Sequence, residues 1–193
     1  MVFSTDGRYL AVTYGAQVAL YLLDSQGGVQ RESILQVSSL KCAFRPDNTM
    51  LACQVARPWQ TALFTVPDGR NVDGFGGLVT ALGWSPDGKL LALAREGGIA
   101  ILDVVSRNVD RDLTVDKFVA YVRVSFSANG QWLIGMAASR LDLWDTRTWI
   151  RAATLEARTE HGRLFQDAAF GPQSPRLAVT GGNHVSIWEA RDQ

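Results

Sequence analysis

A turn motif that returns five times at nearly constant spacing constrains the fold of this chain more than any other feature. The motif is an aromatic residue followed by a short polar segment with Pro, Asp, Asn or Gly, and it begins at Phe3, Phe44, Trp84, Phe126 and Phe170. These aromatic residues stand 41, 40, 42 and 44 residues apart. A period of about 40 residues is typical of folds built from one supersecondary unit per repeat. The spacing therefore predicts five copies of one structural unit.

Each motif is flanked by segments with the composition of β-strands, which makes it the turn of a hairpin. Proline presets the second position of a turn, and Asp, Asn and Gly tolerate the left-handed backbone that reverses the chain. The first runs after the turns are Tyr9–Tyr14, Met50–Ala56, Leu90–Arg95, Trp132–Ala137 and Arg176–Thr180. The second runs are Val18–Leu23, Thr61–Val66, Ile99–Val104, Arg140–Asp145 and His184–Glu189. No segment has the period of an amphipathic helix, so the predicted class is all-β.

Residues at the end of the second runs link these repeats to a known family. Trp144-Asp145 closes one run, and Leu23-Asp24, Leu102-Asp103 and Trp188-Glu189 stand at the equivalent positions of other repeats. On these residues the chain resembles the WD-repeat β-propellers, with repeats of the bacterial type. The resemblance implies a β-propeller or partial propeller of about five four-stranded antiparallel blades. The whole chain, 1–193, is expected to be one repeat domain, with repeats at about 1–38, 39–77, 78–118, 119–163 and 164–193. The Gly-His pair usual in this family is absent, so its buried His–Asp network is not expected here.

The first and last repeats are predicted to be incomplete. Repeat one keeps a stub of its inner strand at Val2–Ser4, and repeat five ends after its third strand. The strand that carries Val185, Ile187 and Trp188 is therefore expected to be an open sheet edge, which favours pairing with another chain. The expected partners are a protein or further domains of a longer chain. The alternative is a homo-oligomer formed through the open terminal blade.

The charge balance argues against two classes of partner. The chain has 19 Lys and Arg against 19 Asp and Glu, so it carries no general positive field for nucleic acid or an anionic membrane. No apolar run approaches the roughly 18 residues of a membrane-spanning helix, and the first residues do not form a secretory signal. We therefore expect neither nucleic-acid nor membrane binding, and a cytoplasmic location.

No motif in the sequence assembles an active site. A Gly-x-Ser-x-Gly elbow is absent, and Gly74-Phe75-Gly76-Gly77 lacks the third glycine and the helix of a dinucleotide site. A propeller enzyme with its site at the central channel is the second hypothesis, for which Ser125, Ser127 and Asp167 are too sparse. No catalytic residue, cofactor or metal site is predicted.

Several acidic residues have structural interpretations. Asp110 and Asp112 flank Arg111 in a predicted outer strand and are interpreted as a solvated edge. Asp145 is the acid of the repeat signature and is expected to accept hydrogen bonds from the backbone. Asp142 lies on the polar side of the alternating pattern in its strand, so its side chain is expected to point to solvent.

The two cysteines lie on the two arms of one predicted hairpin. Counting outward from the turn pairs residue 42 with about residue 52, which places Cys53 on the opposite face from Cys42. We therefore expect two buried thiols and no disulfide.

One rim of the disc is the predicted interaction surface. In the family, the breaks between second and third strands line this rim together with the loops that enter the inner strands. The breaks carry Arg57, Trp59, Arg95, Arg140 and His184, and the entering loops add Lys117, Arg158, His161 and Arg163. Arg and Trp are enriched at interface hot spots. The predicted function is a non-catalytic protein–protein interaction scaffold in a larger signalling or sensor assembly. Ordinary solvated loops, a self-assembling truncated propeller and a propeller enzyme are the alternatives.

Overall fold

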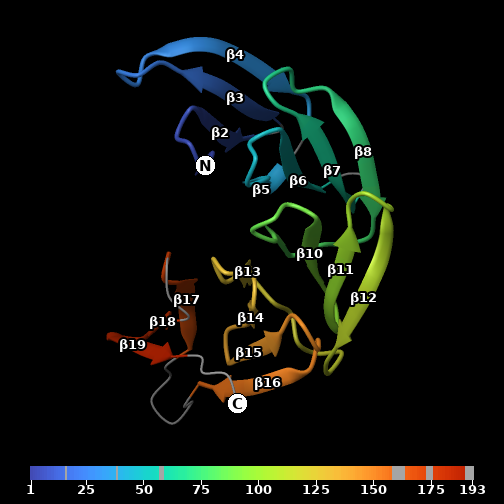
Figure 1. The fold of residues 1–193 in the computed structure, drawn as a ribbon, viewed down its shortest axis with the longest axis vertical. Helices are drawn as coiled ribbons and strands as arrows, with labels where there is room; N and C mark the ends of the chain where they lie inside the picture. Colours follow the sequence, from blue (N-terminus) through green and yellow to red (C-terminus); the bar gives the residue numbers. More distant parts are fainter. Residues whose placement is uncertain (16, 38, 57–58, 158–163, 173–175, 190–193) are drawn as a thin grey trace.

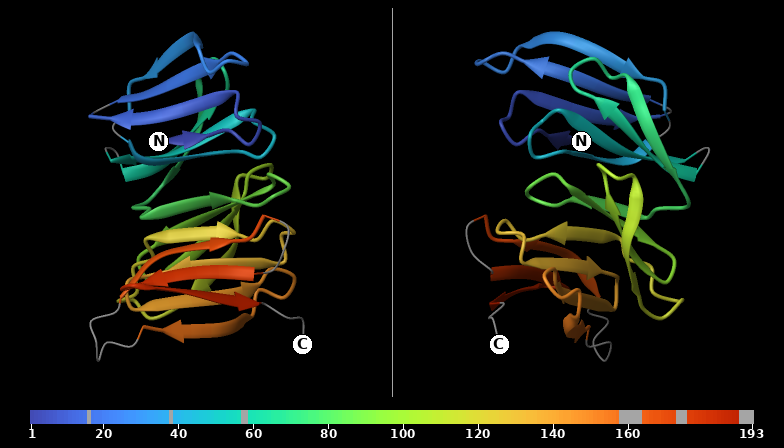
Figure 2. Two further views of the ribbon diagram at one scale, coloured as in Figure 1. Left: turned by 90° about the vertical axis from the view of Figure 1, so that its left-hand side faces the viewer. Right: turned by 45° about the vertical axis from the view of Figure 1, so that its right-hand side comes forward.

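The structure is a computed structural model that describes residues 1–15, 17–37, 39–56, 59–157, 164–172 and 176–189. Its strands form five antiparallel sheets that follow one another along an open arc (Figure 1). Figure 2 shows the same sheets stacked face to face. The described residues contain no helix, and hence none that could span a membrane. The predicted all-β partial propeller is confirmed.

Within the described residues, four sheets have four strands each and the fifth has three. Sheet 1 holds β1 (Val2–Phe3), β2 (Tyr9–Tyr14), β3 (Gln17–Leu23) and β4 (Val29–Leu35). Sheet 2 holds β5 (Ser39–Phe44), β6 (Met50–Ala56), β7 (Trp59–Thr65) and β8 (Asn71–Gly76). Sheet 3 holds β9 (Ala81–Trp84), β10 (Leu90–Arg95), β11 (Gly98–Asp103) and β12 (Asn108–Thr114). Sheet 4 holds β13 (Arg123–Phe126), β14 (Trp132–Met136), β15 (Arg140–Asp145) and β16 (Arg151–Glu156). Sheet 5 holds β17 (Phe165–Phe170), β18 (Arg176–Gly181) and β19 (His184–Glu189).

The repeated turn motif owes its sequence to a small set of hydrogen bonds. The hydroxyl of Ser85 donates to Oδ1 of Asp87 at 2.6 Å and accepts from the amide of Leu90 at 2.9 Å. The same carboxylate oxygen accepts from the amide of Lys89 at 3.1 Å. Gly88 follows with a φ of +69°, a left-handed conformation that favours glycine. Ser4 with Asp6 and Ser127 with Asn129 form the same arrangement. The motif therefore marks the same hydrogen-bonded turn in sheets 1, 3 and 4.

The acid of the repeat signature closes a second turn, between the third and fourth strands. Oδ1 of Asp145 accepts hydrogen bonds from the amides of Arg147 at 2.7 Å and Thr148 at 3.1 Å. Asp103 accepts equivalent bonds from Val105 and Ser106. The backbone hydrogen bond from Thr148 is the main reason that the pKa of Asp145 lies below its ordinary value. The backbone role predicted for Asp145 is confirmed.

The core lies between the sheets. Here the front face of a sheet is the one turned toward the preceding sheet, and the back face is turned toward the following one. Val18 and Leu20 on the back of sheet 1 pack against Phe44 and Leu51 on the front of sheet 2. Three more clusters of this kind lie between sheets 2 and 3, between sheets 3 and 4, and between sheets 4 and 5. Of the tryptophans in the strands, Trp84, Trp132 and Trp144 are buried, whereas Trp188 is 48% exposed.

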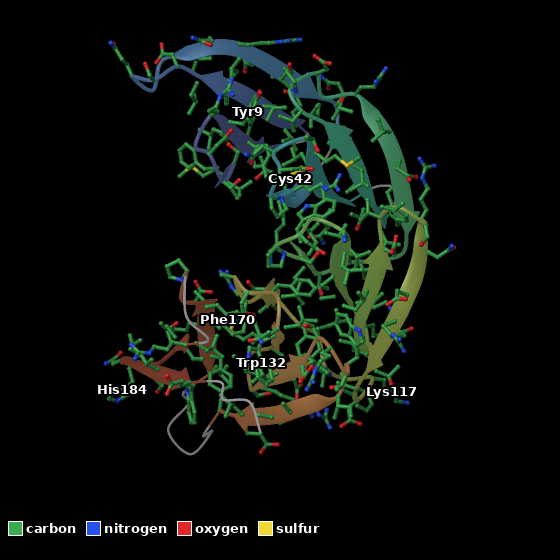
Figure 3. The ribbon with its side chains drawn as sticks, in the orientation of Figure 1. Tyr9, Cys42, Lys117, Trp132, Phe170 and His184 are labelled. Atoms are coloured by element: carbon green, nitrogen blue, oxygen red, sulfur yellow. A yellow bond between two sulfur atoms is a disulfide. The ribbon has the colours of Figure 1, made fainter. Side chains whose placement is uncertain are left out.

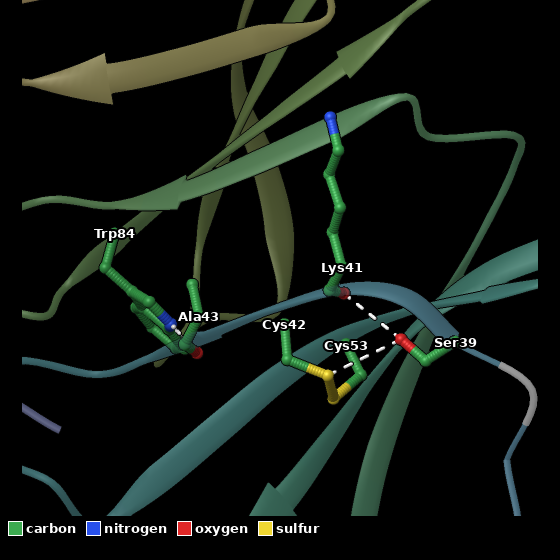
Figure 4. The surroundings of a disulfide bond; sticks show 6 residues. All are labelled: Ser39, Lys41, Cys42, Ala43, Cys53 and Trp84. Atoms are coloured by element: carbon green, nitrogen blue, oxygen red, sulfur yellow. Dashed lines mark hydrogen bonds between the residues drawn. A yellow bond between two sulfur atoms is a disulfide. The ribbon is translucent and has the colours of Figure 1, made fainter. Parts of the chain in front are cut away.

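The prediction for the two cysteines was wrong. Cys42 and Cys53 form a disulfide between β5 and β6, with their Cα atoms 4.1 Å apart (Figure 4). The strand register pairs Cys42 directly with Cys53 and Phe44 with Leu51. The turn thus holds one residue more than the sequence count assumed, with Asn48 in the left-handed conformation. A register change of one residue moves a side chain to the other face of a strand, so both sulfur atoms lie on the same face.

Candidate functional site

The breaks between second and third strands meet the loops that enter the inner strands at one end of the sheets. The amide of Val115 donates to the carbonyl of Gly97 at 2.8 Å, and the amide of Ala157 donates to the carbonyl of Ser139 at 2.9 Å. These bonds fix the entering loops against the breaks. The predicted rim is therefore a continuous part of the fold in sheets 3 and 4.

The residues predicted to bind a protein have different surroundings along this rim. The Arg95 side chain is 42% exposed and pairs with Asp112. Arg140 is turned inward and pairs with Asp142 at 2.6 Å, which leaves only 20% of its side chain exposed. His184 is exposed on sheet 5, well away from Lys117 along the arc (Figure 3). Arg95, two residues before Gly97, is thus exposed beside the loop that carries Lys117.

Other predicted rim residues fall outside the described part of the chain. Arg57, Arg158, His161 and Arg163 are among them. Trp59 begins β7, but its side chain is likewise outside the description. Their proposed contribution to the rim stays a prediction.

The most exposed aromatic side chain on the described rim is Phe118, which the sequence interpretation did not single out. Phe118 is 87% exposed, and the ammonium of Lys117 lies 5.3 Å from the centre of its ring. Val122, in the same loop, is 48% exposed. An aromatic residue directly after the charged residues Asp116 and Lys117 was the available signal. We call Arg95, Lys117, Phe118 and Val122 the rim surface.

Asp142 lies behind this surface, and the prediction that it points to solvent was wrong. Its carboxylate is fully buried and accepts hydrogen bonds from Arg140, from Thr154 at 2.5 Å and from Tyr121 at 2.5 Å. Both faces of an inner blade are covered by neighbouring blades, so alternation along β15 does not separate core from solvent. Gly135, which pairs with Asp142, leaves the space that the Tyr121 ring occupies.

The acids of the outer strand match their interpretation. Asp110 and Asp112 in β12 are exposed, and they pair with Arg111 and Arg95 respectively. Neither is placed beside a nucleophile or a base. They form the solvated edge that the sequence indicated.

The inner strands enclose a hollow of about 330 Å³ at the axis of the arc, where a propeller enzyme would hold its site. It is lined by apolar residues and by Thr13, Lys41 and Arg123. Lys41 donates to the carbonyl of Val122 at 2.7 Å, and Arg123 pairs with Asp167 at 2.5 Å. Partial burial of the ammonium, and next the charge of Arg123, lower the pKa of Lys41. Both charged side chains of this hollow are thus bonded to other groups of the chain.

The described residues do not assemble catalytic or metal-binding groups around this hollow. Ser127 is used in its turn, Ser125 donates to the carbonyl of Phe126 at 3.3 Å, and Asp167 is held by Arg123. No group of three or more His, Cys, Asp or Glu that could hold a metal ion occurs in the part of the chain that the structure describes.

Two curated proteins of Synechocystis sp. match the sequence. The uncharacterized WD repeat-containing protein sll1491 is 33% identical over 124 residues, which are 62% of this chain and 34% of that protein. The chain is similar to WD-repeat proteins. The uncharacterized WD repeat-containing protein slr0143 is 33% identical over 104 residues, 51% of this chain and 8% of that protein. The chain thus spans about a third of the length of one curated relative and under a tenth of the other. No family profile matches it.

A solved structure has a similar fold. Hydrazine synthase from Kuenenia stuttgartiensis superposes with a TM-score of 0.76, covering 93% of this chain and 54% of that chain. The sequences are 19% identical, so this similarity concerns the fold alone.

Proposed function

We propose that the chain is a non-catalytic protein-interaction platform, part of a larger signalling or sensor assembly, that binds its partner through the rim surface. The observation that carries the proposal is the 87% exposure of Phe118 on a loop at the end of the sheets. A large aromatic side chain in this position leaves apolar area in water until a partner covers it. Aromatic and arginine side chains are also the types that dominate binding energy at interfaces.

The loop that carries Phe118 is held in place before any partner arrives. The amide of Val119 donates to the carbonyl of Asp116 at 2.9 Å, and Val115 is bonded to Gly97. At the other end of the loop, the buried Tyr121 is bonded to Asp142. A loop fixed at both ends loses little conformational entropy on binding, which supports rigid presentation of the rim surface.

The disulfide indicates the kind of compartment in which such a platform would be stable. Disulfides persist in oxidising compartments and are rare in the cytosol. The bond between Cys42 and Cys53 therefore favours an oxidising compartment over the cytoplasm that the sequence predicted.

A comparison of two exposed apolar residues tests the rim surface. Val105 is 80% exposed in the turn between β11 and β12, at the other end of sheet 3 from the loop of Phe118. Proteins captured by the wild-type chain are identified by mass spectrometry, and their affinities are measured for Phe118→Ala and for the control Val105→Ala. We expect Phe118→Ala to weaken binding about tenfold or more and Val105→Ala to leave it unchanged. Equal affinity of the wild type and Phe118→Ala would show that the rim surface is not the binding site.

A further inference from the structure

A hollow of about 280 Å³ lies between sheets 3 and 4, at the opposite end of these sheets from the rim surface. The repeated turns of the two sheets contribute Asp87 and Asn129 to its lining, and the turn between β15 and β16 contributes Thr146 and Trp149. Pockets that hold small ligands have volumes from about 300 Å³ upward. The hollow therefore has the size for one small ligand.

The corresponding spaces between the earlier sheets are bridged by side chains. Thr5, in the turn of sheet 1, donates its amide and its hydroxyl to Oδ1 of Asn48 in sheet 2, at 3.0 and 2.9 Å. Arg45, in the turn of sheet 2, reaches sheet 3, where its guanidinium carbon lies 5.9 Å from the centre of the Trp84 ring. Ser85 takes the position of Arg45 in sheet 3, and its short side chain is bonded within its own turn. It therefore does not bridge to sheet 4, and the hollow remains open.

Trp149 occupies a position of its turn at which the backbone favours glycine. Its amide donates to the carbonyl of Asp145 at 2.7 Å, just as the amide of Gly69 in sheet 2 donates to the carbonyl of Thr65 at 2.8 Å. Both residues have a left-handed backbone, with a φ of +58° for Trp149 and +67° for Gly69. A bulky residue pays a steric cost in this conformation that glycine avoids. The turn itself thus does not require the indole, which packs at the edge of the core and lines the hollow.

The hollow combines this aromatic ring with groups that can form hydrogen bonds. Oδ1 of Asp87 is used inside its turn, where it accepts from Ser85 and from the amide of Lys89. Oδ2 of Asp87 and the indole nitrogen of Trp149 have no hydrogen-bond partner in the described part of the chain. The hydroxyl of Thr146 donates to a backbone carbonyl and can still accept. A ligand in the hollow would therefore meet a free carboxylate oxygen and an aromatic face.

The charges around the hollow balance one another. Asp145 pairs with Arg147 at 3.8 Å in the turn between β15 and β16. The hydrogen bond from Ser85 is the main reason that the pKa of Asp87 lies below its ordinary value, and the charge of Lys89 adds to this effect. A charged ligand of either sign would meet a like charge nearby. The surroundings thus favour a neutral ligand that has an apolar face for the indole and hydroxyl groups for the carboxylate.

We propose that this hollow binds one sugar residue of a neutral carbohydrate. The C–H face of a pyranose ring is apolar and flat, so it can pack on the indole of Trp149, which offers a large rigid apolar surface. The hydroxyl groups of the sugar donate hydrogen bonds to Oδ2 of Asp87 and to the hydroxyl of Thr146. The site is separate from the rim surface and does not depend on a protein partner.

NMR titrations with the methyl glycosides of glucose, galactose, mannose and N-acetylglucosamine test the site. Asp87→Asn replaces the free acceptor oxygen by a donor but keeps the turn, because Asn129 accepts the same hydrogen bonds in sheet 4. Asp47→Asn makes the same change in the turn of sheet 2, away from the hollow. We expect at least one glycoside to bind, and its affinity to fall about tenfold in Asp87→Asn and to stay unchanged in Asp47→Asn.

A second pair of variants tests the aromatic face. Trp149→Gly removes the indole and gives the turn the residue that its backbone favours. Arg107→Gly is the matched control, because Arg107 has the same left-handed conformation in sheet 3 and pairs with Asp73 of sheet 2. We expect Trp149→Gly to weaken binding about tenfold or more and Arg107→Gly to leave it unchanged. Circular dichroism verifies that all variants keep the same β-sheet content.

Three results would overturn the proposal. The first is that none of the four glycosides binds to the wild-type chain. The second is an affinity that stays unchanged in Asp87→Asn or in Trp149→Gly. The third is binding of methylguanidinium, used as a cationic probe, without binding of any glycoside, which would assign the hollow to a positively charged group.

Discussion

The hydroxyl of Tyr121 donates a 2.5 Å hydrogen bond to the fully buried carboxylate of Asp142. Tyr121 belongs to the loop that carries Phe118, and Asp142 lies in the middle of β15. The Tyr121 ring also packs edge-on against Trp144, with ring centres 5.9 Å apart. This pair therefore connects the rim surface to the core between sheets 3 and 4.

Removing the Tyr121 hydroxyl alone measures how much this hydrogen bond contributes to the free energy of unfolding. Tyr121→Phe keeps the ring against Trp144 but deprives the buried carboxylate of one donor. Because hydrogen bonds to charged groups contribute about 1.5 to 3 kcal/mol, we expect a loss of about 1.5 kcal/mol in the free energy of unfolding. Urea denaturation measures it. Tyr14→Phe, at a 47% exposed position, is the control and should change little. Equal effects of both variants would contradict the role of the bond.

Asp142 should make stability depend on acid pH. Burial alone raises the pKa of its carboxyl, but hydrogen bonds from Arg140, Thr154 and Tyr121 outweigh burial and hold the pKa below its ordinary value of 3.8. A depressed folded-state pKa gives stability that is present above the unfolded-state value and lost as pH falls through the folded-state value.

The variant Asp142→Asn removes this contribution. We expect the wild type to be more stable than the variant at neutral pH, and the difference to shrink as pH falls below about 4. Denaturation midpoints of both proteins across the acid range measure the difference, in which the shared effects of the other carboxylates cancel. A difference independent of pH would mean that Asp142 is not held as an anion.

Ser85 tests the repeated turn. Its hydroxyl makes two hydrogen bonds inside the turn between β9 and β10, so Ser85→Ala is expected to cost about 1 to 2 kcal/mol of unfolding free energy. Ser139→Ala, at an exposed position between β14 and β15, is the matched control. Thermal or chemical denaturation reports both. A loss for Ser85→Ala no larger than the control's would show that the turn sequence does not matter for stability.

Much of the fold was accessible from the sequence because each turn has a local cause. The bonds of Ser85 and Asp87 are formed within six residues, so the motif marks the hairpin wherever it occurs. Several predicted strands, including Tyr9–Tyr14 and Leu90–Arg95, match the observed bounds. The burial of Trp144 followed from its place in the repeat.

The errors arose where the answer depends on distant parts of the chain or on a single residue of register. Asp142 was read as solvent-facing because alternation identifies two faces of a strand but not what covers each of them. Cys53 was put on the wrong face by one residue of turn length. Phe118 lies in a loop with no periodic pattern, so its exposure followed only from the three-dimensional arrangement.

The uniform interface between sheets has a consequence for how such a chain can evolve. Every blade meets its neighbours through the same front and back faces, and the packing clusters join consecutive sheets. If one repeat of about 40 residues were duplicated and inserted at a connecting loop, the new sheet would pack between two existing sheets. The single interface between those sheets would become two interfaces of the kind that the chain already forms. Gene duplication can therefore lengthen the array without new core packing, while the rim loops remain free to diverge from one blade to the next.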